Sequence, residues 1–169
     1  MSESRAELVA ALDEAVARAG SDRERPQARS SGGAAQRPLS IADDDVASVA
    51  PLLLRVLTAA AGTLEVTEAL GDVPAARALL RVTDANAAIE LQAGQGRLHA
   101  EAADVRGKGP KIDATAATWL GLLGGTLRPW LAFTRGLVVC RAGLNELRWI
   151  QTVAERLQRG YQAARESER

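Results

Sequence analysis

The stretch that most constrains this chain is residues 112–157, which hold all three tryptophans, the only phenylalanine and the only cysteine of the 169 residues. The stretch is almost devoid of groups capable of acid–base or nucleophilic chemistry. Its apolar periodicity predicts a short strand, an apolar helix broken by glycines, a second strand and a long amphipathic helix. Because this segment is so apolar and so poor in reactive groups, we expect it to enclose an apolar ligand.

Length, charge and cysteine content bound the class of protein. A chain of 169 residues is long enough for one domain with appendages. The 21 basic and 21 acidic side chains cancel, so no overall field attracts nucleic acid or an anionic membrane. A single cysteine cannot form an intramolecular disulfide, which fits a reducing compartment. The N-terminus has no signal-peptide pattern, and Arg128 and Arg135 interrupt the longest apolar run. We therefore expect a cytoplasmic protein without a transmembrane segment.

The first part of the chain predicts a helix and a linker. Ser4 and Glu7 have the spacing of a capping box, and apolar residues follow at helical spacing over 4–19. The apolar stripe is narrow, so this helix needs to dock on its own domain, on a second copy or on another protein. Residues 20–40 are rich in Gly, Ser, Pro and Arg and predict a flexible linker. A second helix with a broad apolar face follows over 43–61.

From Ala78 the apolar period shortens to that of strands. Turn residues separate four predicted strands, at 78–84, 87–93, 97–105 and 111–118, and a fifth lies at 137–143. We expect the first four strands to form a meander, the fifth to join after a helical crossover, and a last helix to run from 144 to 165. The predicted fold class is α+β, a five-stranded mostly antiparallel sheet covered by helices. The domain division is an N-terminal helix (1–19), the linker (20–40) and the domain itself (41–165).

The residues that could carry catalysis are few. His99 is the only histidine, and strand alternation places it on the solvent face beside Glu101. Cys140 lies in the middle of a strand, where a buried inert thiol is the ordinary outcome, and Asp113 is a lone carboxylate at a strand start. No nucleophile elbow, phosphate loop or dinucleotide-binding spacing occurs. We predict no catalytic residue, no metal and no cofactor; an enzyme would have to use His99 or a buried carboxylate as its base.

The order of motifs in the second half of the chain resembles the sterol carrier protein type-2 family of non-specific lipid-transfer domains, in particular its bacterial single-domain members. The matching positions are Ile112-Asp113-Ala114-Thr115, Gly124-Gly125, Ala132-Phe133, Gly136, Gly143 and Leu144 to Leu147. The resemblance covers roughly residues 43–160. It implies a hydrophobic tunnel, between the sheet and the helices, for sterols, acyl chains or acyl-CoA. Residues 1–40 have no counterpart in the minimal domain, and the connection at 62–77 is irregular.

Combining the apolar segment with this resemblance gives a candidate binding site. The predicted lining residues are Trp119, Leu123, Trp130, Phe133, Val139, Leu147, Trp149, Ile150 and Val153. The same side chains would also serve simply to fill a core. Arg128 or Arg135 could meet the carboxylate or phosphate of a head group, or remain a solvated charge at a helix end.

Two functions follow as hypotheses. The first is non-enzymatic binding or transfer of an apolar ligand, such as a lipid, sterol-like, acyl or isoprenoid molecule, with transient contact with a membrane surface. The alternative is an accessory module whose cavity is filled by its own side chains. Such a module would recruit partner enzymes or dimerise through its terminal helices, including residues 4–19.

Overall fold

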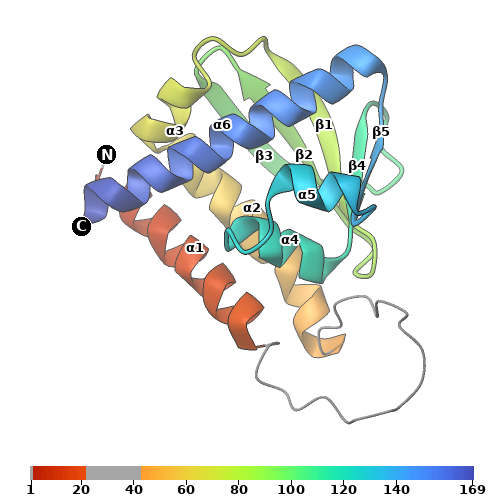
Figure 1. Cartoon of the computed structure of the whole chain (residues 1–169), viewed down its shortest axis with the longest axis horizontal. Coiled ribbons are helices and arrows are strands. Elements are labelled where there is room, and N and C mark those ends of the chain that lie inside the picture. The colour runs from red at the N-terminus through yellow and green to blue at the C-terminus, as the bar shows by residue number, and fades with distance from the viewer. Residues whose placement is uncertain (1, 22–42) are drawn as a thin grey trace.

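A computed structural model describes residues 2–21 and 43–169, and it places a five-stranded sheet against a set of helices (Figure 1). The helices are α1 (Ser2–Ser21), α2 (Asp43–Ala61), α3 (Leu64–Ala69), α4 (Ala116–Leu123), α5 (Pro129–Thr134) and α6 (Leu144–Glu168). The strands are β1 (Ala76–Val82), β2 (Ala87–Gly94), β3 (Arg97–Ala103), β4 (Lys111–Ala114) and β5 (Val138–Arg141). Apart from its first two positions, which continue α1, the predicted linker at 20–40 lies outside the described residues. Within those residues, no helix combines the length and apolarity that crossing a bilayer requires.

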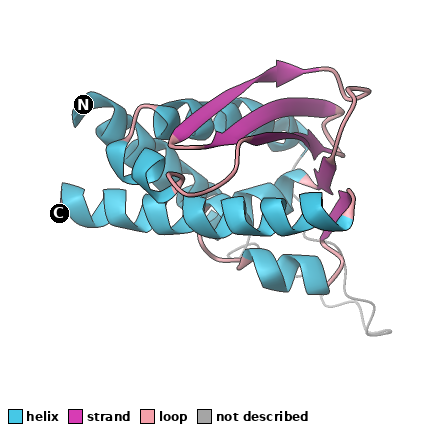
Figure 2. Cartoon of the chain, turned by 90° about the horizontal axis from the view of Figure 1, so that it is seen from above, coloured by secondary structure: helices cyan, strands magenta, loops and turns pink. Residues whose placement is uncertain are grey.

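The strand order is β3-β2-β1-β4-β5, which confirms a five-stranded, mostly antiparallel sheet. The expected meander of the first four strands is wrong at the fourth. Strand β4 pairs in parallel with β1, with Leu80 opposite Ile112, and does not pair with β3. Figure 2 shows the sheet in the upper part of the view, with the long C-terminal helix α6 running below it.

The connection between β3 and β4 explains this topology. It must cross β2 and β1, roughly three strand spacings or 14 Å, and an extended chain of its length spans that distance easily. Residues 104–110 are fixed to the outer face of β1. Arg81 Nη1 donates to the Val105 carbonyl at 3.2 Å, and Gly107 lies against the Leu79 side chain, where a Cβ atom would be 3.3 Å from Cδ2. The turn chemistry of this loop was visible in the sequence, but its docking partner was not.

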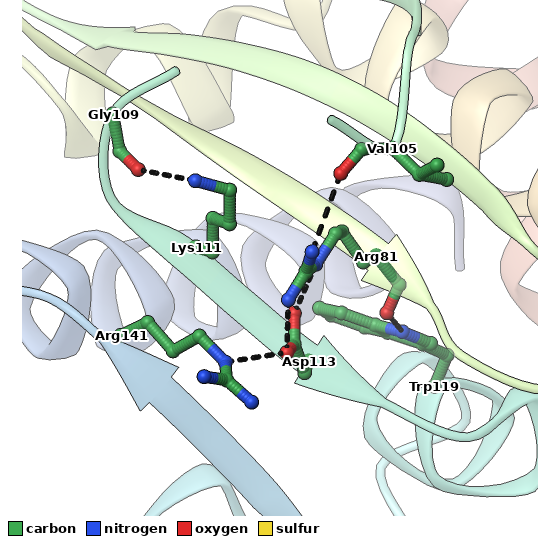
Figure 3. Close-up of polar contacts among 7 residues, drawn as sticks. All are labelled: Arg81, Val105, Gly109, Lys111, Asp113, Trp119 and Arg141. Carbon is green, nitrogen blue, oxygen red and sulfur yellow. Dashed lines mark hydrogen bonds and ion pairs between the residues drawn. The ribbon is translucent and has the colours of Figure 1, made fainter. Parts of the chain in front are cut away.

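The outer face of the sheet carries an ion-pair cluster (Figure 3). The guanidinium of Arg81 makes a bidentate contact with the carboxylate of Asp113, with Nε to Oδ1 at 2.5 Å, and Arg141 Nε lies 3.2 Å from Oδ2. The Asp113 side chain is only 9% exposed. Hydrogen bonds from Arg81 lower the pKa of Asp113, burial opposes this, and Arg141 adds to the lowering. Asp113 is therefore held as a carboxylate in a structural role.

Helix α1 docks on its own domain, the first of the three options its sequence left open. Leu8 and Leu12 are fully buried, and the helix packs on α2, α4 and α6. Arg55 of α2 reaches across to α1, with Nε 2.5 Å from a Glu7 oxygen and Nη1 2.7 Å from a Glu14 oxygen. The narrow apolar stripe is thus buried against the rest of the domain, with ion pairs along its edge.

Helix α6 crosses α3 at close range through Gly160. A Cβ atom at this glycine would lie 2.8 Å from the Cα of Val66, which is backbone and cannot move away cheaply. Replacing glycine by alanine inside a helix ordinarily stabilises a protein by about 0.5–1 kcal/mol. We expect Gly160→Ala instead to destabilise the fold by about 1–3 kcal/mol, because the two helices must separate. Urea unfolding measures the free energy, and stabilisation by this substitution would show that the crossing is looser than described.

Candidate functional site

A cavity of about 570 Å³ lies between the inner face of the sheet and the helices. Its wall draws on α2, α4, α5, α6 and four strands of the sheet. Eight of the nine predicted residues line it, namely Trp119, Leu123, Trp130, Phe133, Leu147, Trp149, Ile150 and Val153. The structure therefore brings together side chains from three successive helices, α4, α5 and α6.

The floor of the cavity is a cross-strand row of apolar side chains. Leu80 of β1 lies opposite Ile112 of β4, which in turn lies opposite Cys140 of β5. Ala78 and its partner Leu91 of β2 extend the floor toward the other edge of the sheet. Because side chains alternate along a strand, the ion-pair cluster of Arg81 and Asp113 falls on the opposite face. One short sheet thus separates a charged outer face from an apolar inner one.

Val139 is the predicted lining residue that does not line the cavity. Its side chain is 48% exposed, and its register partner is Asp113 on the outer face. Its neighbours Val138 and Cys140 point inward instead. In the sequence Val-Val-Cys, either phase of the strand alternation puts an apolar residue inward, so periodicity alone cannot choose between them.

Two of the three tryptophans in the wall are fixed by their indole nitrogens. Trp119 Nε1 donates to the Arg81 carbonyl at 3.0 Å, as Figure 3 shows, and Trp149 Nε1 donates to the Pro74 carbonyl at 2.7 Å. These bonds attach α4 to Arg81 near the end of β1, and α6 to the segment that precedes β1. Trp130, on α5, is 66% exposed even though it lines the cavity. The wall is therefore anchored on two sides and open to solvent at α5.

Sequence reasoning missed several contributors to the wall. Leu53 and Leu57 come from the apolar face of α2. The sequence predicts that face, but α2 is far along the chain from the other lining residues, so nothing in the sequence links it to the site. Ala154, Leu157 and Tyr161 belong to the same stripe of α6 as the predicted residues. The helical spacing of that stripe was the signal that could have found them.

Polar groups occur at the margins of the cavity. Arg128, Glu155 and Gln158 contribute to its lining, and Gln158 Nε2 donates to the Leu122 carbonyl at 2.9 Å. A second cavity of about 430 Å³ shares Gln158 and Tyr161 with the first and adds Arg159, Gln162 and Arg165. Burial raises the pKa of the Tyr161 phenol, which stays neutral between the two spaces.

The candidate catalytic groups are not brought together. His99 lies outside the cavity lining, with its side chain 62% exposed and its Nε2 3.7 Å from Glu101. Cys140 does line the cavity, where burial, followed by the charge of Asp113, raises the pKa of its thiol and makes it a weaker nucleophile at neutral pH. Across residues 2–21 and 43–169, no group of three His, Cys, Asp or Glu side chains is placed to hold a metal ion. Of these groups, Cys140 lines the cavity and His99 lies outside its lining.

Comparison with known proteins gives likenesses of fold. No family model and no curated protein sequence matches the chain. Among solved structures, sterol carrier protein 2 is similar at 21% identity and a TM-score of 0.48, over 69% of this chain and 94% of that one. A hypothetical protein from Thermus thermophilus, described as possibly a sterol carrier protein, is similar at 23% identity and a TM-score of 0.46, over 82% and 94%. A stereoselective inverting sec-alkylsulfatase from Pseudomonas sp. is similar at 16% identity and a TM-score of 0.47, over 64% of this chain and 16% of that one.

These likenesses are of fold alone, at identities of 16–23%.

Proposed function

We propose that this protein binds and transfers one apolar ligand, a lipid, sterol-like, acyl or isoprenoid molecule, without catalysing a reaction on it. The observation that carries the proposal is the cavity of about 570 Å³ with its predominantly apolar wall. Pockets that hold small organic ligands in proteins usually measure about 300–1,000 Å³ and are mostly apolar. A space of this size, left unfilled by the protein's own side chains, is accounted for by an apolar occupant.

Burial of the ligand's apolar surface supplies the affinity. At about 25 cal/mol per Å², removing roughly 300 Å² from water gives about 7.5 kcal/mol, part of which offsets the cost of association. Each further buried methylene adds about 0.8 kcal/mol, which is close to a fourfold gain in affinity. Affinity should therefore rise steeply with the length of an acyl chain until the cavity is full.

A titration with cis-parinaric acid, a fluorescent fatty acid, tests the proposal. All three tryptophans line the cavity, so a bound acceptor should quench them by energy transfer. Saturated fatty acids of increasing length should then displace the probe, with about a fourfold gain per methylene. Lack of saturable binding, or an affinity independent of chain length, would contradict the proposal.

The chain's single cysteine reports where the ligand sits. Cys140 lines the cavity, and any alkylation by N-ethylmaleimide must occur there because no other thiol exists. We expect slow labelling of the free protein, because burial raises the pKa of this thiol, and slower labelling still with saturating fatty acid. Mass spectrometry of the intact protein gives the rate. An unchanged rate at saturation would place the ligand elsewhere.

The packing of α1 favours the carrier over the accessory-module alternative. The buried Leu8, Leu12 and Ala15 already face α2, α4 and α6 of the same chain. Recruiting a partner enzyme through this face would require α1 to leave its own domain and expose those side chains to water.

A further inference from the structure

We propose that the surface of α5 docks on bilayers that contain anionic phospholipid and presents the cavity to the membrane. We define the α5 surface by Arg128, Trp130, Phe133 and Arg135. The inference deepens the proposed function, because it names the surface through which the ligand would enter, but membrane docking can be measured without any ligand.

Exposed aromatic residues form the centre of the α5 surface. Trp130 and Phe133 are 66% and 46% exposed, while Ala132 between them is fully buried. A spacing of three places the two rings on one side of the helix. Both rings also line the cavity, so they lie where the cavity meets solvent. Tryptophan in particular is enriched at the interface of membranes with water, where an amphipathic ring sits at the level of the head groups.

Basic residues bracket these rings. Arg128 precedes α5 and Arg135 follows it, and both are exposed. No acidic residue occurs in the sequence between Asp113 and Glu146, although the whole chain has balanced charges. No ion pair within the described parts of the chain includes either arginine. The local charge thus complements lipid phosphates even though the net charge does not.

A bilayer fits this surface better than a second copy of the chain does. A twofold dimer through α5 would bring each arginine of one protomer near those of its partner, since such an interface uses the same patch twice. An anionic bilayer instead offers phosphates to the arginines and an apolar boundary to the rings. An apolar ligand could then pass between the bilayer and the cavity without crossing water.

Vesicle flotation of the full chain tests the proposal. We expect the protein to float with vesicles of 70% phosphatidylcholine and 30% phosphatidylglycerol at low salt, and much less with pure phosphatidylcholine or at high salt. The variants Trp130→Ser/Phe133→Ser and Arg128→Gln/Arg135→Gln should each lower the partition coefficient by about tenfold or more. Matched controls are Leu64→Ser, an exposed apolar residue of α3, and Arg97→Gln/Arg106→Gln, two exposed arginines elsewhere. The controls should change partition by less than about twofold.

Three results would overturn the docking proposal. The first is a lack of flotation by the unmodified protein, and the second is equal loss in the controls. The third is a dimer, detected by light scattering, that the Trp130→Ser/Phe133→Ser variant dissociates, because the α5 surface would then bind a second copy. Circular dichroism on every variant confirms that it is folded. Binding of cis-parinaric acid without flotation would contradict only the docking proposal. Flotation without binding of cis-parinaric acid would contradict only the proposed function.

Discussion

Replacing Ala154 with phenylalanine is expected to weaken fatty-acid binding by about a hundredfold while leaving the protein folded. Ala154 is a half-buried residue of α6 whose side chain lines the cavity. A ring in that position enters space that a ligand would otherwise occupy and displaces roughly three to four methylenes, worth about 3 kcal/mol. The change in helix propensity costs only a few tenths of a kcal/mol. Displacement of cis-parinaric acid measures the effect.

The matched control is Ala163→Phe, on the same helix. Ala163 is also half-buried, but its side chain does not line the cavity. This variant should bind within about threefold of the unmodified protein. Equal loss of binding in both variants would point to a general perturbation of α6, and full binding by Ala154→Phe would place the ligand outside the cavity.

Replacing Asp113 with alanine is expected to lower the free energy of unfolding by about 3 kcal/mol. The substitution leaves Arg81 at the outer face of the sheet without its bidentate partner. Breaking a buried ion pair in this way usually costs about 3–5 kcal/mol. We expect the low end of that range, because the Arg81 side chain is still 23% exposed. Asp72→Ala is the control: Asp72 is 68% exposed in its pair with Arg156, so its loss should cost at most about 1 kcal/mol.

The same pair predicts a pH dependence of known sign. The pKa of Asp113 is lowered in the folded protein, whereas an unfolded aspartate titrates near 3.9. The carboxylate therefore stabilises the fold fully above the unfolded pKa, and this contribution is lost as the pH falls through the folded pKa. The stability difference between the unmodified protein and Asp113→Ala should be constant above about pH 5 and should shrink below about pH 4. A difference that grows on acidification would contradict this account of the cluster.

The parts of the fold that the sequence predicts are those set by local patterns along the chain. Alternation placed His99 on the solvent face, and the turn residues and Gly124 placed element boundaries within a few positions. The pairing of β4 with β1 could not be predicted in this way, because it depends on the docking of the 104–110 connection over Leu79 and Arg81. Such contacts join residues with no shared local pattern.

The same distinction holds for the candidate site: some lining residues follow from a local pattern, and others depend on how the elements pack. The helical stripe of α6 pointed to Leu147, Ile150 and Val153 because the period of a helix fixes which residues share a face. Residues 138–140, Val-Val-Cys, carry no such information: the prediction places Val139 in the lining, whereas the structure places Val138 and Cys140 there. The contribution of Leu53 could not be predicted either, because only the packing of α2 beneath the sheet brings it to the cavity.

The most direct test of the central claim is mass spectrometry of the protein as purified, under native conditions and after extraction with organic solvent. The account predicts one apolar molecule per chain, removed by extraction and replaced when fatty acid is added back. The added fatty acid should protect Cys140 from alkylation. A protein that carries no lipid before extraction, and takes up none when fatty acid is supplied, would contradict the claim that the cavity is a binding site.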